Sequence, residues 1–413
     1  MASARSGKRW VLALATVPLI SVGCTTPRLA AVPSALTAKA DVPGYASKIR
    51  YFPRDSGDVE SLKQDVVDAA ARETTYLRTR EHVGPLPPAA FLAISGGGDN
   101  GAFGAGFLNG WTKAGTRPQF KLVTGISTGA LIAPFAFLGP AYDDRLKYLY
   151  TSISFRDVAA QRSLLSVLFA DALADSTPLW NLVRKNITQD VLEAIAAEHA
   201  KGRILLVGTT DLDARRPVIW NLTKIAASGR PEALQLFQSL LVASAAIPGT
   251  FPPVMIDVEA EGKPFQEMHV DGGTVAQVFV YPAAINLRDL SQEHGIQRSR
   301  KLYIIRNARL DPEWAQVDRR LLPIALRAIS ALIQYQGIGD LYRIYTIAQR
   351  DDVEFNLAFI PATFNTPHTA DFDTAYMRQL FDLGYGMAEA GYSWYPKPPV
   401  LLSGDEPLPP EPQ

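Results

Sequence analysis

The chain has 413 residues, of which 47% are hydrophobic, and its 41 basic residues balance its 41 acidic residues. This apolar fraction is ample for the core of one large α/β domain or of two smaller ones. A formal net charge of zero gives no electrostatic footprint for nucleic acid, so we expect no nucleic-acid partner.

The N-terminus has the pattern of an export signal. Three early cations precede the apolar run 10–22, which is too short to span a bilayer comfortably. The run is followed by Cys24, the only cysteine of the chain, in a segment that resembles a bacterial lipoprotein signal, although Ser21 stands where such signals usually carry an aliphatic residue. The resemblance implies a signal peptide over residues 1–23, lipidation of Cys24 and attachment of the exported protein to a membrane surface. Thr25 favours the outer membrane, and an ordinary cleaved signal peptide with an incidental cysteine is the alternative.

The segment after the signal has no sustained hydrophobic period. Residues 24–58 are rich in proline, alanine and serine, and they predict a tether or a loosely packed arm. A helix follows, with Leu62 and Val66 on its apolar stripe, and residues 84–88 end it before the first core strand.

The first glycine-rich turn lies between a short apolar strand, predicted over residues 91–95, and a helix predicted over residues 102–111. The glycines of this turn are Gly96, Gly97, Gly98 and Gly101. Their main-chain N–H groups are bare of side chains and lie at the positive end of the following helix, which is a place that holds an anion.

The same glycines also satisfy the dinucleotide-binding pattern G-x-G-x-x-G. That pattern expects an acidic residue about 20 residues further on to bind ribose. Residues 116–125 contain no acid, so the sequence disfavours a nucleotide cofactor.

A serine occupies the second glycine-rich turn, which follows a strand predicted over residues 120–124 and precedes an apolar helix over residues 130–137. Gly125 and Gly129 flank Ser127 at two residues on either side. Glycines at these positions let the strand and the helix pack closely, so the serine is held in a strained turn with its hydroxyl exposed. This is the pattern of a nucleophile elbow, and Ser127 is the candidate nucleophile.

The candidate base for Ser127 is Asp271. It ends a short predicted strand, and Gly272 and Gly273 after it permit close approach of the backbone. A carboxylate with the ordinary pKa of about 3.9 is a feeble base for a hydroxyl. Desolvation by apolar neighbours would raise this pKa and improve the proton transfer, so we expect a Ser127–Asp271 dyad.

Two other residues are rivals for the base. Asp211 follows the strand predicted over residues 203–210 and would lie at the ligand edge of an α/β sheet, although aspartate also serves turns. His269 would complete a Ser-His-Asp triad if its strand is regular enough to place residues 269 and 271 on one face. The other histidines have no position that indicates catalysis: His82, His199, His294 and His368.

Together these motifs resemble the patatin-like phospholipase family. The match covers residues 90–281 and includes the proline-constrained loop 246–253. The resemblance implies a three-layer α/β/α fold with a central, mostly parallel sheet, in a hydrolase domain that spans residues 59–395.

The resemblance also implies an activity, which is hydrolysis of lipid acyl esters without a metal or another cofactor. In this sequence Ser127 would be the nucleophile, Asp271 the base, and the amides of Gly97 and Gly98 the oxyanion hole. A non-enzymatic envelope lipoprotein and an acyltransferase on the same fold are the alternatives. The sequence makes no prediction of the oligomeric state.

One position departs from the family pattern. Many members carry Arg or Lys where this chain has Asn100, and Asp99 precedes it. The missing cation weakens the expectation of a phosphate headgroup, so a neutral or short acyl ester and a lysophospholipid are alternative substrates.

The rest of the chain is less informative. Residues 163–169 are strongly apolar and predict either a lid over the site or a buried helix. Residues 300–306 predict a strand. The long helical pattern that begins at Pro323 is interrupted at Gly337 and Gly339 and predicts a core helix pair, with an amphipathic face against a membrane as the alternative. Residues 396–413 form a proline-rich tail.

Overall fold

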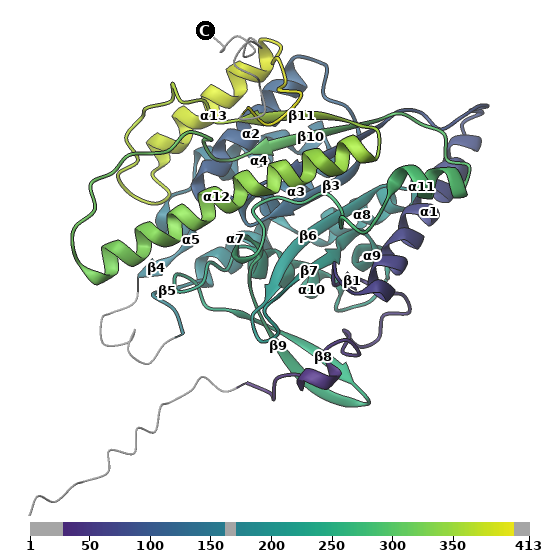
Figure 1. Ribbon diagram of the computed structural model, residues 1–413, viewed down its shortest axis with the longest axis horizontal. Helices are drawn as coiled ribbons and strands as arrows, with labels where there is room; N and C mark the ends of the chain where they lie inside the picture. Colours follow the sequence, from purple (N-terminus) through teal and green to yellow (C-terminus); the bar gives the residue numbers. More distant parts are fainter. Residues whose placement is uncertain (1–27, 162–170, 400–413) are drawn as a thin grey trace, which may run out of the picture.

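The computed structural model describes residues 28–161 and 171–399, which fold around one large β-sheet (Figure 1). The nine strands of this sheet are β1 (Arg50–Tyr51), β2 (Ala89–Ile94), β3 (Phe120–Ile126), β6 (Ile204–Asp211), β7 (Arg216–Asn221), β8 (Val254–Ala260), β9 (Lys263–Asp271), β10 (Arg300–Arg306) and β11 (Val353–Phe359). Their order is β1-β7-β6-β3-β2-β10-β11, and β9 pairs with both β6 and β8. The neighbours from β6 to β11 are parallel, so the central sheet is mostly parallel, as predicted. A separate two-stranded sheet pairs β4 (Ala160–Gln161) with β5 (Ala174–Asp175).

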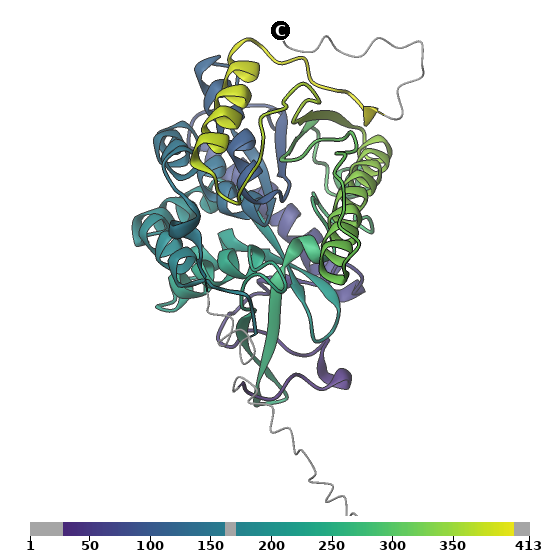
Figure 2. The ribbon, with the colours of Figure 1, turned by 90° about the vertical axis from the view of Figure 1, so that its left-hand side faces the viewer.

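Helices cover both faces of the sheet, which gives the predicted three-layer α/β/α arrangement (Figure 2). One face carries α1 (Ser56–Arg78), α11 (Leu287–Glu293) and α12 (Leu321–Arg350). The other face carries α2 (Gly101–Lys113), α3 (Thr128–Leu138), α4 (Asp143–Thr151), α5 (Phe155–Val158), α7 (Thr177–Asn186), α8 (Gln189–Ala200), α9 (Leu222–Ala227), α10 (Ala233–Ser244) and α13 (Thr374–Glu389). Four short 3-10 helices complete the described elements: η1 (Ser34–Leu36), η2 (Gly98–Asn100), η3 (Pro140–Tyr142) and η4 (Gly272–Thr274).

The central strands are buried on both faces, which is why they read as continuous apolar runs. In β2, Leu92 and Ile94 pack into the core beside α2 and α3, whereas Phe91 and Ala93 pack into the core beside α1 and α12. Parallel strands covered by helices on both faces characteristically lack an alternation of polar and apolar residues.

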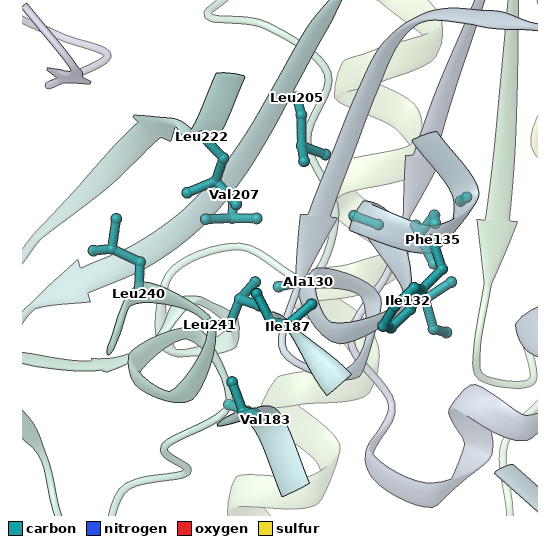
Figure 3. Packing of buried hydrophobic residues seen from close by; sticks show 14 of the residues in the cluster. Ala130, Ile132, Phe135, Val183, Ile187, Leu205, Val207, Leu222, Leu240 and Leu241 are labelled. Atoms are coloured by element: carbon teal, nitrogen blue, oxygen red, sulfur yellow. The ribbon is translucent and has the colours of Figure 1, made fainter. Parts of the chain in front are cut away.

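The core beside α3 also builds the walls of the candidate site. Figure 3 shows Val183, Ile187 and Leu241 close together next to Ala130. These side chains come from α7 and its C-terminal end, from α10 and from α3, so three helices converge on one apolar region.

The sequence predicts a tether or a loosely packed arm over residues 24–58, and residues 28–58 of the structure include one strand of the large sheet. β1 pairs antiparallel with β7, and the fully buried Arg50 forms a 2.5 Å ion pair with Glu267. Burial alone would raise the pKa of Glu267, but the hydrogen bond from His269 and the charge of Arg50 lower this pKa to about 2. The N-terminal segment is therefore fixed to the sheet by a buried ion pair that composition could not reveal.

Only the C-terminal half of the long helix α12 has the buried side chains that the prediction of a core position expects. Leu341 and Ile344 in its C-terminal half are buried, but Leu326 and Leu332 are 58% and 71% exposed. Within residues 28–161 and 171–399, no helix combines the length and the apolar composition needed to cross a membrane. The predicted signal peptide, the apolar segment 163–169 and the tail from residue 400 onward lie outside the described residues.

Candidate active site

The turn after β2 is shaped by Asn307, which follows β10. Asn307 donates from Nδ2 to the Ser95 carbonyl at 2.9 Å, and its Oδ1 accepts from the Gly104 N–H at 3.0 Å. Gly97 has a φ of 155° and Gly98 a φ of 59°, and a Cβ on Gly97 would lie 2.2 Å from the Asn307 carbonyl oxygen, so glycine is required there. Within the described chain, the N–H groups of Gly97 and Gly98 have no acceptor, which leaves two main-chain donors available to a ligand.

The turn after β3 has the strained backbone that the sequence predicts for a nucleophile elbow. Ser127 has a φ of 54° and a ψ of −126°, which is unusual for a residue with a side chain. A Cβ on Gly125 would lie 2.4 Å from the Gly129 carbonyl oxygen, and a Cβ on Gly129 would lie 2.3 Å from the Ile94 carbonyl oxygen. The two glycines are therefore needed for α3 to begin directly against the strands.

The two turns lie in contact with each other. A Cβ on Gly96 would lie 3.3 Å from the Ser127 Cβ, and a Cβ on Gly101 would lie 2.2 Å from the Thr128 Oγ1. The free N–H groups of Gly97 and Gly98 thus belong to the turn that packs directly on the serine. This is the neighbourhood in which an oxyanion formed at Ser127 would need hydrogen-bond donors.

The elbow is also tied to the rest of the sheet through Ser244 at the end of α10. The Ser127 N–H donates to Ser244 Oγ at 3.0 Å, and Ser244 Oγ donates to the Gly208 carbonyl at 2.7 Å. The amide of the serine itself is therefore already paired, and the available donors are those of the first turn.

Asp271 ends β9 in a buried position. It pairs with Thr209 of β6 in antiparallel register, is 4% exposed, and accepts a 2.6 Å hydrogen bond on Oδ1 from the Gly273 N–H. Burial raises the pKa of Asp271 from its ordinary 3.8 to about 7, although hydrogen bonds from the Ser127 side chain and the Gly273 N–H partly offset this effect. The structure therefore brings together the two side chains that the sequence selects as nucleophile and base.

Close packing of glycines lets β9 reach the elbow. A Cβ on Gly272 would lie 2.5 Å from the Gly208 carbonyl oxygen and 2.8 Å from Ile126 Cδ1, and a Cβ on Gly273 would lie 2.9 Å from the Asp271 Oδ1. Gly272 and Gly273 thus have the role that the sequence predicts. Gly208 within β6 serves the same approach, and its place inside an apolar strand gave no separate signal.

His269 does not complete a triad with Ser127. Its Nδ1 lies 2.9 Å from Thr209 Oγ1, its Nε2 lies 3.2 Å from Glu267 Oε2, and the side chain is fully buried. Both ring nitrogens therefore have partners in the buried network that fixes Arg50. All five histidines lie in the described residues, and none of them hydrogen-bonds to Ser127.

Asp211, the other rival, has the structural role of a turn residue. Its carboxylate accepts from the Ala214 N–H at 3.2 Å and pairs with Arg216 Nε at 3.3 Å. Its charge is therefore committed to the hairpin between β6 and β7.

The position that departs from the family pattern and the residue before it bind the start of α13 and the segment before it. Asp99 accepts from the Phe372 N–H at 2.8 Å and lies 2.7 Å from His368 Nε2, and Asn100 Oδ1 accepts from the Tyr376 hydroxyl at 2.6 Å. Asn100, which stands where many members carry a cation, and the preceding Asp99 therefore bind a neighbouring segment to the first turn. Sequence reasoning identified the departure but not this role.

Gln277 connects the parts of the site and carries no sequence signal. Its carbonyl accepts from the Gly96 N–H at 2.9 Å, and its side-chain Nε2 donates to the Gly273 carbonyl at 2.7 Å. Its own N–H donates to Asp340 of α12 at 2.6 Å. One residue thus links the first turn, the turn after Asp271 and the helix layer.

An apolar pocket leads away from Ser127 and Gly98. It opens beside these two residues, and its cavity volume is about 80 Å³. The hydroxyls of Thr128 and Tyr150 pair with each other at 2.5 Å, so these polar atoms are satisfied inside the pocket. Most other lining residues are apolar and come from α3, α4, α7 and α10, and they include Leu131, Phe135, Leu149, Leu182, Val183 and Leu241.

A strained serine, a buried carboxylate and available main-chain donors lie together at the carboxyl edge of the α/β sheet, which is where ligands bind in sheets of this kind. Among the described residues, no three His, Cys, Asp or Glu side chains gather into a group that could hold a metal ion. The family model described as Patatin-like phospholipase matches residues 92–284, a range that contains both Ser127 and Asp271. The chain therefore contains a domain of the patatin-like phospholipase family.

Similar solved structures cover most of this chain at low sequence identity. They include VipD from Legionella pneumophila, with 13% identity, a TM-score of 0.31 and coverage of 73% of this chain and 66% of that chain. Human GIVD cytosolic phospholipase A2 has 11% identity, a TM-score of 0.32 and coverage of 70% and 52%. ExoU in complex with SpcU from Pseudomonas aeruginosa has 13% identity, a TM-score of 0.30 and coverage of 74% and 52%.

This chain thus spans about two thirds of the length of VipD and about half of the other two proteins. All three TM-scores lie below 0.5, so the family assignment depends on the match over residues 92–284. No curated protein matches the chain.

The raised pKa of Asp271 predicts an unusual dependence of stability on pH. The folded state keeps the proton of this carboxyl up to about pH 7, whereas the unfolded chain loses it near 3.8, so the free energy of unfolding falls as the pH rises between these values. At about pH 8 we expect Asp271→Asn to be more stable than the wild type by up to about 4 kcal/mol, and we expect the difference to shrink toward about pH 4. Urea unfolding at both pH values measures this difference.

Asp211→Asn is the matched control, because it removes the charge of another buried aspartate that is paired with Arg216. This variant should lose stability at about pH 8. An Asp271→Asn variant that is less stable than the wild type at that pH would contradict the predicted cost of burying the carboxylate.

Proposed function

We propose that this chain is a lipid acyl-ester hydrolase of the phospholipase A or lysophospholipase type, with Ser127 and Asp271 as its catalytic dyad. The observation that carries the proposal is the buried carboxylate of Asp271, whose pKa burial raises to about 7 and the side chain of the strained serine partly lowers. The patatin-like phospholipase domain over residues 92–284 supports the same class of substrate.

The first half of the reaction forms an acyl-enzyme. Asp271 takes the proton of the Ser127 hydroxyl as Oγ attacks the carbonyl carbon of the ester, and the N–H groups of Gly97 and Gly98 donate to the oxyanion that results. The tetrahedral intermediate collapses, the bond to the alcohol oxygen breaks, and Asp271 returns the proton to the leaving alcohol. A pKa near 7 makes this carboxylate a stronger base than an ordinary aspartate and a competent acid for the return step.

The second half hydrolyses the acyl-enzyme. Asp271 takes a proton from water as the water oxygen attacks the acyl carbonyl, and the same two amides stabilise the oxyanion. The bond between the acyl carbon and Ser127 Oγ then breaks, the serine recovers a proton from Asp271, and the fatty acid leaves. Loss of one such donor costs about 2.7–4 kcal/mol in a well-studied hydrolase, so the glycine turn matters to the rate as well as to the shape of the site.

The pocket supports a fatty acyl chain as the group that Ser127 accepts. Its walls are mostly apolar, and it begins beside the serine, so an acyl carbonyl at Ser127 would direct its hydrocarbon tail between α3, α7 and α10. The alcohol portion of the ester would lie toward the first turn. Asp99 and Asn100 offer no cation to a phosphate there, so we include neutral esters beside phospholipids and lysophospholipids among the substrates to be tested.

We also propose that the protein is exported and anchored by a lipid on Cys24, with the outer membrane favoured. The support is the signal pattern of residues 1–23 and the single cysteine that follows it. Mass spectrometry of the mature N-terminus tests this proposal, and a mature chain that begins elsewhere or carries no lipid would refute it.

The dyad predicts how hydrolysis responds to substitution and to pH. Ser127→Ala and Asp271→Asn should each lower kcat for a chromogenic acyl ester by at least about 10³-fold, because each removes a group that acts in the chemical step. In the wild type, kcat/KM should rise with pH through about 7 as Asp271 loses its proton. Steady-state rates across this pH range measure both effects.

Asp211→Asn is the control for loss of a buried carboxylate, and it should retain the pH profile of the wild type. Hydrolysis that persists in Ser127→Ala or in Asp271→Asn removes that residue from the mechanism. A wild type without any esterase activity would favour a binding scaffold, and transfer of the acyl group to an added acceptor in preference to water would indicate an acyltransferase.

The pocket predicts a selectivity for acyl chain length that can be changed at one wall. Leu182→Trp adds volume inside the pocket and should lower kcat/KM at least tenfold for long-chain esters while sparing short-chain ones. The matched control is Asn181→Trp on the exposed side of the same helix, which should leave the chain-length profile unchanged. If Leu182→Trp reduces activity equally at all chain lengths, the acyl chain does not occupy this pocket.

A further inference from the structure

The N-terminal half of α12 and the segment before it form a concentrated apolar surface. Among the described residues, fifteen large hydrophobic side chains are exposed, and nine of them lie between residues 314 and 335. Trp314 and Leu321 are each 88% exposed, and Tyr335 is 67% exposed. Single exposed apolar residues are normal on protein surfaces, whereas a contiguous group marks an interaction site.

This surface begins next to the candidate active site. Gln336 lies 3.4 Å from Gln277, the residue that links the two turns beside Ser127, and Gln334 donates to the Arg309 carbonyl at 3.0 Å. From Gln334 back to Leu321 the helix extends for roughly 20 Å at about 1.5 Å per residue. Figure 1 shows this part of α12 reaching the end of the molecule where β4 and β5 lie.

The charges on this surface are mostly positive. Residues 314–335 contain Arg319, Arg320 and Arg327 and one acidic residue, Asp318. Arg319 and Arg320 are exposed immediately before the first turn of α12, where the helix dipole disfavours cations, so helix stability does not explain them. Arginines beside an apolar helix complement the phosphates of anionic lipids.

The distribution of apolar side chains around the helix favours a bilayer over a protein groove. At about 100° per residue, the exposed apolar positions from Leu321 to Tyr335 cover roughly 200° of the circumference, and Ser330, Arg327 and Gln334 occupy the remainder. A helix that packs against one partner helix uses a much narrower stripe. The aromatic residues Trp314 and Tyr335 lie at the two ends of the surface, and their amphipathic rings suit the level of lipid headgroups.

We infer that residues 314–335 insert into the surface of an anionic lipid bilayer and bring the active-site edge to the lipids. The inference rests on the proposed function, which gives the site a reason to meet a bilayer. The helix lies in the interface, since no described helix qualifies as a membrane span. It is a contact separate from any lipid on Cys24.

Vesicle binding by the full chain tests the inference, with Cys24→Ser present throughout so that no lipid anchor contributes. The parent should sediment with vesicles of phosphatidylcholine and phosphatidylglycerol, and more weakly with phosphatidylcholine alone. Ile329→Glu/Leu332→Glu should bind the mixed vesicles at least tenfold more weakly, because it places charge in the apolar surface. Val83→Glu/Tyr148→Glu, at two other exposed apolar positions, should bind like the parent.

A second variant separates the charges from the apolar contacts. Arg319→Gln/Arg320→Gln should lose the preference for vesicles that contain phosphatidylglycerol and should keep the weaker binding to phosphatidylcholine. All variants should hydrolyse a soluble short-chain ester at the parental rate, which shows that the fold and the site are intact.

Parental binding by Ile329→Glu/Leu332→Glu would overturn the inference, and so would a parent that binds neither type of vesicle. The inference would also fail if the parent is a dimer that this variant makes monomeric without a change in vesicle binding, because the surface would then join two copies of the chain. Vesicle binding that depends on α12 in a protein without esterase activity would refute the proposed function and leave this inference standing.

Discussion

The desolvation of one carboxylate is the constraint on which the site depends. Asp271 is buried at the end of β9, and its charge is compensated only by the hydrogen bonds from Gly273 and Ser127. A cation within reach would relieve the cost of burial, but it would also lower the pKa of the carboxyl group, as Arg50 does for Glu267. The pKa of Asp271 therefore stays high, and the folded state is less stable above about pH 7 as a result. Functional sites commonly lower the stability of a protein in this way.

The rest of the structure supplies what that arrangement needs, which is close approach of backbones. β9 runs antiparallel to β6, so Asp271 reaches the elbow only because Gly272 and Gly208 carry no side chains at the crossing. Gln277 and Asn307 then fix the first turn from two other segments, and they leave the amides of Gly97 and Gly98 available. The stability stored in two apolar cores on either side of the sheet can sustain the strain at Ser127 and the buried charge.

The sequence predicts those parts of the site whose conformation is determined by residues that are adjacent in the chain. Glycines around Ser127 and after Asp271 specify turns that few other residues can adopt, so their positions were readable without a structure. Ser244 and Gln277 have no such signature, because each acts through a hydrogen bond to a segment that is remote in sequence. The packing of the segment around Arg50 was not predicted for the same reason, since its ion-pair partner, Glu267, lies 217 residues away.

The helix α12 shows a second limit of prediction from sequence. Apolar periodicity indicates that one face of a helix is removed from water, but it does not indicate what covers that face. On sequence alone, both halves of α12 have the pattern of a core helix. The two halves differ in burial, and the change occurs near Gly337, where a Cβ would lie 2.2 Å from the Arg306 guanidinium. From that contact onward α12 packs against the sheet, and Leu341 is buried. The preceding half has apolar side chains around most of its circumference, and within residues 28–161 and 171–399 no second element covers them. A helix fixed at one end beside the active site and exposed at the other can hold the site at a lipid surface without itself being part of the chemistry.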